Sequence, residues 1–145
     1  MTFTFLDDST AVSPQILPDN IPALVDAGFD AVICNRPDME VPLEASSEAL
    51  RAACEAAGLT FYSNPLAPGG LTMDAINAQA KAIRSSNGKV LAYCASGTRS
   101  ALLWAFASAA SNTHSPEDIE IALEKGGYPF PGISQQLMSV AAQSS

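Results

Sequence analysis

The amino-acid sequence predicts an α/β protein with a mostly parallel central sheet of about four to five strands and helices on both faces. Short apolar runs rich in β-branched and aromatic residues alternate with amphipathic segments of helical spacing, an order typical of βαβ units. Glycine and proline residues separate these segments. Because 48% of the 145 residues are hydrophobic and 15% are charged, the chain is expected to form a single domain over residues 1–145.

Four segments have the length and composition of strands. The segment 29–35 (FDAVICN) is a β-branched run between Gly28 and a proline-containing loop, which is typical of a buried strand. The segment 2–6 (TFTFL) alternates weakly and predicts an edge strand. The other two predicted strands are 59–64 (LTFYSN) and 89–93 (KVLAY).

Helices are predicted between and after these strands, most of them with recognisable ends. Gly28 is expected to stop the first helix, and Ser46 or Ser47 to cap the second. Thr72 is the expected cap of the third, and the capping box SPED at 115–118 starts a later one. The predicted helical segments are 18–28, 46–58, 72–86, 100–110, 115–127 and 133–143.

The acidic composition limits the partners. With 15 acidic and 7 basic side chains, the formal net charge is -8, so the overall field repels nucleic acid and anionic membrane surfaces. No apolar run approaches the ~18 residues needed to cross a bilayer, and the first ten residues lack the order of a secretion signal. We therefore expect a cytoplasmic protein with no nucleic-acid or membrane partner, whose oligomeric state stays open.

The cysteine and histidine content indicates neither a disulfide framework nor a metal site. Three cysteines lie far apart without a CxxC pair, and the chain has one histidine. No cofactor is expected. Any anion that this acidic protein binds must therefore be captured by a local site.

The stretch YCASGTRS, residues 93–100, is the strongest candidate for such a site. Cys94 directly follows a predicted central strand, and ligands bind at the carboxyl ends of strands in parallel α/β sheets. The next four residues can direct their backbone amides to one point at the start of a helix, with the glycine supplying the necessary backbone freedom. These residues are Ala95, Ser96, Gly97 and Thr98.

Two side chains complete the candidate site. Arg99 can hold two oxygens of a tetrahedral anion, and Ser100 can donate a hydrogen bond to the Cys94 sulfur. The helix start and Arg99 should lower the pKa of the thiol and make it a nucleophile at neutral pH. The alternative is a small buried hydrophobe at a turn. That second interpretation is adopted for Cys34 and Cys54, which have no basic neighbour in a turn.

These residues resemble the cysteine-phosphatase superfamily, whose signature is a strand-end cysteine followed by a loop that ends in arginine and then serine or threonine. The similarity is greatest to a bacterial phosphatase-like domain that occurs alone or fused to β-lactamase-like hydrolases. Besides YCASGTRS, it rests on GFDAVICNRPDMEV at 28–41 and AAGLTFYSNPLAPGGLT at 56–72. The resemblance implies a single phosphatase-like domain with a dual-specificity-phosphatase-like fold, in which Cys94 is the nucleophile and Arg99 the anion clamp.

The resemblance leaves the reaction open. True phosphatases of the superfamily have five residues between the cysteine and the arginine, whereas this chain has four, as in rhodanese-type sulfurtransferases. Related domains often have histidine before the cysteine and arginine after it, where this chain has Tyr93 and Ala95. Sulfane-sulfur transfer from thiosulfate or a persulfide is therefore slightly favoured. The alternatives are hydrolysis of a phosphoester through a cysteinyl-phosphate, a catalytically weak anion-binding module and, more weakly, a cysteine redox sensor.

A phosphatase also needs an acid to protonate the leaving group, and the loop NPLAPGG before the cysteine strand contains none. Asp74 and Asp38 are candidates, each with a structural alternative at a helix start or in a turn. Arg36 either adds a second positive charge to the pocket or pairs with Asp38 or Glu40. His114 is expected in a surface loop rather than as a base for the cysteine.

Overall fold

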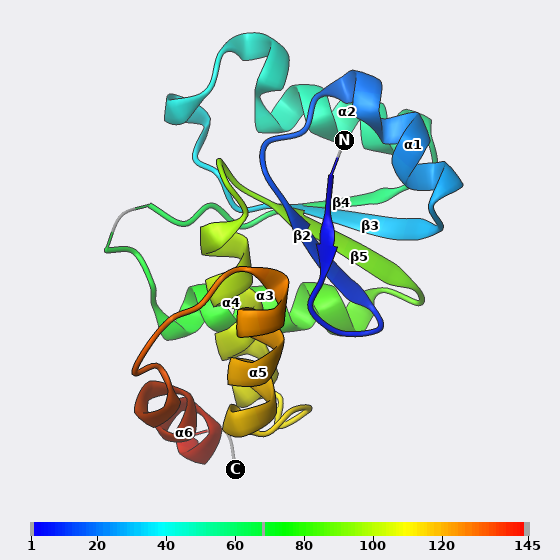
Figure 1. Ribbon diagram of the computed structural model, residues 1–145. Helices are drawn as coiled ribbons and strands as arrows, with labels where there is room; N and C mark the ends of the chain where they lie inside the picture. Colours follow the sequence, from blue (N-terminus) through cyan, green and yellow to red (C-terminus); the bar gives the residue numbers. More distant parts are fainter. Residues whose placement is uncertain (1, 68, 144–145) are drawn as a thin grey trace.

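The structure is a computed structural model that describes residues 2–67 and 69–143, with a five-stranded sheet between two groups of helices (Figure 1). The strands are β1 (Thr4–Phe5), β2 (Thr10–Ser13), β3 (Phe29–Cys34), β4 (Thr60–Ser63) and β5 (Lys89–Tyr93). Their spatial order is β1-β2-β5-β3-β4, and only the edge strand β1 runs antiparallel to its neighbour. The predicted mostly parallel α/β fold is confirmed.

The sequence pattern does not predict β2, although this strand pairs with both β1 and β5. All four residues of β2 are buried, and the outer two, Thr10 and Ser13, are polar. A run of two apolar residues with polar ends shows neither the alternation nor the length that identifies a strand. The preceding turn is held by Asp7, whose Oδ1 accepts hydrogen bonds from the amides of Ser9 at 2.9 Å and Thr10 at 2.7 Å.

In the described residues, six α-helices and three short 3-10 helices connect or follow the strands. Three of the expected caps are present: the hydroxyls of Ser46, Thr72 and Ser115 each accept a hydrogen bond from an amide of the first helical turn. The predicted helix 18–28 divides into a 3-10 turn and a shorter α-helix. The α-helices are α1 (Ile21–Asp26), α2 (Ser47–Ala56), α3 (Met73–Ser85), α4 (Thr98–Ala110), α5 (Pro116–Gly126) and α6 (Ser134–Gln143); the 3-10 helices are η1 (Pro18–Asn20), η2 (Asp38–Glu40) and η3 (Leu43–Ala45).

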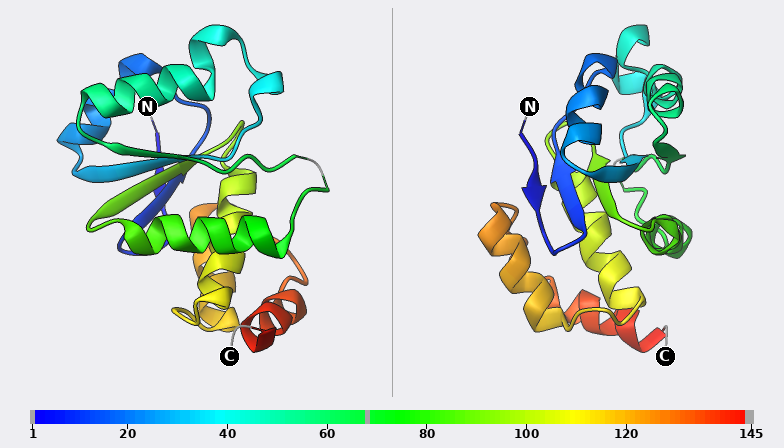
Figure 2. Two further views of the ribbon diagram at one scale, coloured as in Figure 1. Left: turned by 180° about the vertical axis from the view of Figure 1, so that it is seen from behind. Right: turned by 90° about the vertical axis from the view of Figure 1, so that its right-hand side faces the viewer.

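The helices cover both faces of the sheet, as Figure 2 shows from two sides. Alternate residues of β3 and β5 point to opposite faces. Ile33 and Ala92 belong to the core that includes α3 to α6, whereas Cys34 and Tyr93 belong to the core beneath α1 and α2. This alternation decides which layer each residue at a strand end faces.

Helix α4 is the central element of the larger helical layer. Nine of its 13 residues are buried, and it packs against α3, α5, α6 and the sheet. A helix surrounded in this way is apolar on all sides, which explains the run ALLWAFASAA. Because α4 is held on every side, the loop that enters its N-terminus is anchored at both ends. In the part of the chain that the structure describes, no helix has the length and apolar character needed to cross a membrane.

Candidate active site

Cys94 lies at the base of the loop between β5 and α4. Tyr93 faces the layer of α1 and α2, so Cys94, one residue further, faces the layer that contains α4. Cys94 is fully buried, and Tyr93 is buried on the other side of the sheet. The Tyr93 side chain therefore points away from the loop.

The three cysteines are all buried, but only Cys94 has a lowered pKa. Burial alone would raise the pKa of the Cys94 thiol; hydrogen bonds from the amides of Ser100, Ser96 and Gly97 and from the Ser100 hydroxyl outweigh it and bring the pKa below its ordinary value. Burial raises the pKa of Cys34, and raises that of Cys54 to about 11. Cys94 thus has the electrostatic setting of a nucleophile, and the other two cysteines are apolar core residues.

The amides that face the sulfur differ from those expected. Gly97 adopts a left-handed conformation with φ +93° and donates its amide to the Cys94 sulfur at 3.1 Å. The amide of Thr98 instead donates to the hydroxyl of Ser96 at 3.4 Å, within the loop, and Ala95 is exposed at the rim. The amide of Gly97 makes the hydrogen bond to the sulfur, and the amides of Ser100 and Ser96 also lower the pKa of Cys94, whereas those of Ala95 and Thr98 do not.

Ser100 connects the loop to a buried polar network. Its hydroxyl donates to Oδ1 of Asn35 at 2.9 Å, and it also stabilises the Cys94 thiolate. Asn35 exchanges two hydrogen bonds with the side-chain amide of Gln79 on α3, at 2.9 and 3.2 Å. All three polar side chains of this network are fully buried. The Ser100 hydroxyl is therefore positioned by Asn35, which follows β3, and Asn35 is in turn held by Gln79 on α3.

Arg99 is held by a carboxylate and a carbonyl. Its Nη1 donates to Oε2 of Glu40 at 3.0 Å and to the carbonyl of Leu66 at 2.9 Å, and its Nη2 donates to Oε1 of Glu40 at 2.8 Å. Of the five guanidinium N–H groups, these contacts leave Nε–H and one Nη2–H, which lie on the same edge. Hydrogen bonds to Glu40 raise the pKa of Arg99, and interaction with Cys94 also raises it, because the guanidinium lies near the sulfur. Arg99 therefore keeps two N–H groups near Cys94 that its hydrogen bonds to Glu40 and Leu66 do not use.

Glu40 is shared between two arginines. Hydrogen bonds from Arg99 lower the pKa of Glu40, and Arg36 adds to the effect with Nε at 3.2 Å from Oε1. Arg36 also donates to the side chain of Gln15 at 3.2 Å. Arg36 thus pairs with Glu40, and Glu40 is the side chain that links it to Arg99.

The two aspartates singled out as possible acids lie in structural positions. Asp38 accepts hydrogen bonds from the amide of Ser47 at 2.8 Å and from its hydroxyl at 2.9 Å, which ties the loop after β3 to the start of α2. Asp74 is exposed in the first turn of α3 and makes no side-chain hydrogen bond or ion pair with any described residue. Neither contacts Cys94 or Arg99.

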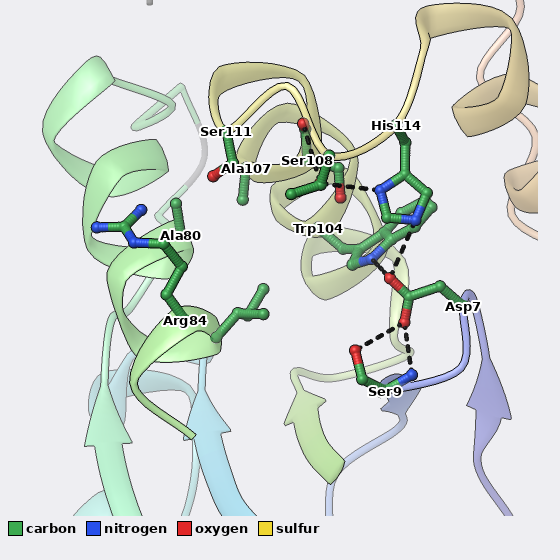
Figure 3. Close-up of a pocket in the computed structure, with 11 residues that line it drawn as sticks. Asp7, Ser9, Ala80, Arg84, Trp104, Ala107, Ser108, Ser111 and His114 are labelled. Carbon is green, nitrogen blue, oxygen red and sulfur yellow. Dashed lines mark hydrogen bonds and ion pairs between the residues drawn. The ribbon is translucent and has the colours of Figure 1, made fainter. Parts of the chain in front are cut away.

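His114 lies in a separate pocket at the other end of α4 (Figure 3). Its Nε2 is 3.3 Å from Oδ2 of Asp7, which also accepts a hydrogen bond from Nε1 of Trp104 at 3.2 Å. The histidine lies in the loop between α4 and α5, as expected, and is half-buried against Trp104. Asp7, the partner of His114, precedes the first residue of β2, whereas Cys94 follows the last residue of the parallel strand β5. His114 and Cys94 therefore lie at opposite ends of the sheet, and His114 is not placed to act as a base for Cys94.

Residues that the sequence does not single out for the site make several of its contacts. Glu40 appears in the sequence only as a partner for Arg36, and no local pattern relates it to Arg99, 59 positions later. Asn35 carries one weak signal, because it is a polar residue at the end of a predicted buried strand. Tyr128 donates its hydroxyl to the carbonyl of Ser96 at 3.3 Å, and nothing in its surrounding sequence indicates this contact.

The chain is similar to known proteins over most of its length. A family profile described as "Beta-lactamase hydrolase-like protein, phosphatase-like domain" matches residues 2–111. A beta-lactamase hydrolase-like protein of Xylella fastidiosa is 29% identical over 120 residues, which are 83% of this chain and 28% of that protein. The chain thus spans 28% of the length of this curated relative.

Solved structures share the fold over nearly the whole chain. A candidate phosphatase from Neisseria meningitidis is 27% identical with a TM-score of 0.79, covering 97% of this chain and 99% of the other. PTPMT1 in complex with PI(5)P has a TM-score of 0.77 at 17% identity, covering 98% and 96%, which establishes a common fold. The profile match, which spans most of the chain, and these structures lead to one conclusion: the chain belongs to the family of phosphatase-like domains of β-lactamase hydrolase-like proteins, within the cysteine-phosphatase superfamily.

Proposed function

We propose that the protein is a cysteine-dependent phosphatase that hydrolyses a small phosphoester through a covalent intermediate on Cys94. One observation carries the proposal: the sulfur of Cys94 accepts a hydrogen bond from the Gly97 amide at 3.1 Å and lies near Arg99, which has two N–H groups on one edge that Glu40 and Leu66 do not use. Three non-bridging phosphate oxygens suit this edge together with the inward-facing amides of the loop. The preference for sulfur transfer finds no support in the comparisons, because the matched family is described as phosphatase-like and the Neisseria structure as that of a candidate phosphatase.

The reaction has two displacement steps. The Cys94 thiolate attacks phosphorus and forms an S–P bond while the bond to the leaving oxygen breaks. Water then attacks the same phosphorus, breaks the S–P bond, and releases inorganic phosphate and the thiolate. In both steps Arg99 and the amides of Ser96 and Gly97 stabilise charge on the non-bridging oxygens. The hydroxyl of Ser100 stabilises the sulfur when it leaves in the second step.

Protonation of the leaving group is the weak part of this catalyst. Pairing with Arg99 and Arg36 keeps Glu40 ionised, so it has no proton to donate, and Asp74 lies exposed on α3 without contact to the loop. The leaving oxygen must therefore take its proton from water. We infer that the preferred substrates are small phosphoesters whose leaving groups are stable as anions, such as aryl phosphates or phosphoanhydrides.

Turnover of p-nitrophenyl phosphate tests the proposal. Cys94→Ser should abolish release of p-nitrophenol, and Arg99→Lys, which keeps the charge but loses the two-donor edge, should reduce kcat/KM about 10²-fold. The buried variant Cys54→Ala is the control and should keep the activity of the wild type. Sulfur transfer from thiosulfate to cyanide is measured in parallel. Thiosulfate turnover without phosphoester turnover would replace the proposal with sulfur transfer, and phosphate binding without either would replace it with a binding module.

A further inference from the structure

Tyr128 reaches the catalytic loop from outside the segment that the family profile matches, which ends at residue 111. Helix α5 ends at Gly126 and is followed by Gly127, whose φ of +85° is the left-handed conformation that favours glycine after a helix end. The amide of Tyr128 then donates to the carbonyl of Leu123 at 2.9 Å. This turn directs the half-buried Tyr128 side chain back toward the loop before α4, where its hydroxyl donates to the carbonyl of Ser96 at 3.3 Å.

The carbonyl of Ser96 and the amide of Gly97 belong to one peptide unit. In a trans peptide these two groups point in opposite directions, and the described residues contain no cis peptide. Tyr128 binds the outward end of the unit, and the inward end donates to the Cys94 sulfur at 3.1 Å. If this peptide rotated, it would turn a carbonyl oxygen toward the thiolate and toward any bound anion, and would remove one of their donors.

Close packing at Gly97 supports the same assignment. A methyl group at the Cβ position of Gly97 would collide with the hydroxyl of Tyr128, so the ring lies directly against the peptide that it binds. The φ of +93° at Gly97 is already a conformation that residues with a Cβ avoid. Loop and tyrosine therefore fit each other only with glycine at position 97.

We propose that Tyr128 is a positioning residue that sets the orientation of the Ser96–Gly97 peptide and thereby the ability of the loop to stabilise a thiolate and bind an oxyanion. The inference rests on the proposed role of Cys94 as a thiolate nucleophile. It assigns a role in the active site to the segment between α5 and α6.

The chemistry of the tyrosine suits this role. Burial, together with the neighbouring Cys94 thiolate, raises the pKa of Tyr128, so its hydroxyl keeps the proton that it donates throughout the working range of a thiolate enzyme. The oxygen-to-oxygen distance of 3.3 Å is long for a hydroxyl donor. We therefore expect that removing this hydroxyl changes the properties of the loop by an amount at the lower end for one hydrogen bond.

The test is the pKa of Cys94 in the full chain, measured from the pH dependence of iodoacetamide alkylation of its peptide by mass spectrometry. Tyr128→Phe removes the hydroxyl and keeps the ring. It should raise the pKa of Cys94 by about half a unit, which is about a threefold lower ionisation constant of the thiol. The Kd for tungstate, an unreactive tetrahedral oxyanion, should rise by a similar factor. Tyr62→Phe on the edge strand β4 is the matched control and should change neither quantity.

The outcomes separate the two proposals. Suppose that the pKa of Cys94 is low in the wild type, and that Tyr128→Phe and Tyr62→Phe give the same Cys94 pKa and the same Kd for tungstate. The positioning role of Tyr128 is then wrong, whatever the phosphatase assay shows. If Tyr128→Phe shifts both values but the wild type hydrolyses no phosphoester, the positioning role stands and the proposed reaction fails. An ordinary pKa for wild-type Cys94 overturns both. A loss of urea stability in Tyr128→Phe without a shift of the Cys94 pKa would reduce the tyrosine to a purely structural residue.

Discussion

Replacing Asn35 with alanine should destabilise the fold more than any change at an exposed asparagine. Asn35 is fully buried and uses its whole hydrogen-bonding capacity: Nδ2 donates to the carbonyl of Asn64 and to Gln79, and Oδ1 accepts from Gln79 and Ser100. The variant leaves Nε2 of the fully buried Gln79 without its acceptor, which costs about 1–3 kcal/mol. With the lost bond to Asn64, the expected decrease in the free energy of unfolding is about 2–4 kcal/mol.

A double-mutant cycle isolates the pair. Gln79→Ala removes the same two mutual hydrogen bonds from the other side, so the double variant should be less destabilised than the sum of the single variants. The expected coupling energy is about 1–2 kcal/mol. Urea denaturation gives the free energies, and Asn77→Ala on the exposed side of α3 is the control, expected within about 0.5 kcal/mol of wild type. A coupling energy near zero, or an Asn35→Ala variant as stable as Asn77→Ala, would refute the reasoning.

Three further predictions concern the catalytic chemistry. Glu40→Gln keeps one acceptor for Arg99 but loses the contact through two oxygens, so kcat should fall about tenfold. KM should not rise, because the variant removes a negative charge beside the bound anion. An unchanged or higher kcat would contradict this prediction. The alkylation rate of Cys94 should reach half its maximum below pH 9.0, whereas Cys54 should require about pH 11, as peptide-resolved mass spectrometry would show. Since the folded pKa of Cys94 is lowered, its ionisation stabilises the fold above about pH 9, and this contribution is lost as the pH falls through the folded pKa. Alkyl phosphates should react about 10²–10⁴-fold more slowly than aryl phosphates, and equal rates would indicate a general acid that the geometry does not provide.

The elements that the sequence predicts correctly are those with a local cause. The strands at 29–35 and 89–93 are β-branched or apolar runs with clear ends. Ser46 and Thr72 are residue types that are strongly preferred as helix N-caps. Strand β2 lacks such a cause. Its short apolar part becomes a strand because β1 and β5 supply hydrogen-bonding partners on both sides, which its own residues do not reveal.

The same division holds within the site. The loop from Cys94 to Ser100 is contiguous, so its spacing alone indicates an anion-binding loop at a helix start. Its orientation comes from distant residues: Glu40 lies 59 positions before Arg99, and Tyr128 lies 32 positions after Ser96. A motif specifies which donors are present, whereas the directions in which they point depend on contacts that only the fold creates.

Ser100 shows how such a distant contact could affect the chemistry. Its hydroxyl has one proton, and both Oδ1 of Asn35 and the sulfur of Cys94 can accept it. When the sulfur is a thiolate, the charged acceptor makes the stronger hydrogen bond. Because Nε2 of Gln79 also donates to Oδ1 of Asn35, this oxygen keeps a partner when the Ser100 proton turns to the sulfur. The Ser100 hydroxyl can therefore turn its proton to a charged Cys94 sulfur without leaving an unsatisfied acceptor in the core, which gives the three fully buried polar side chains near Cys94 a physical role.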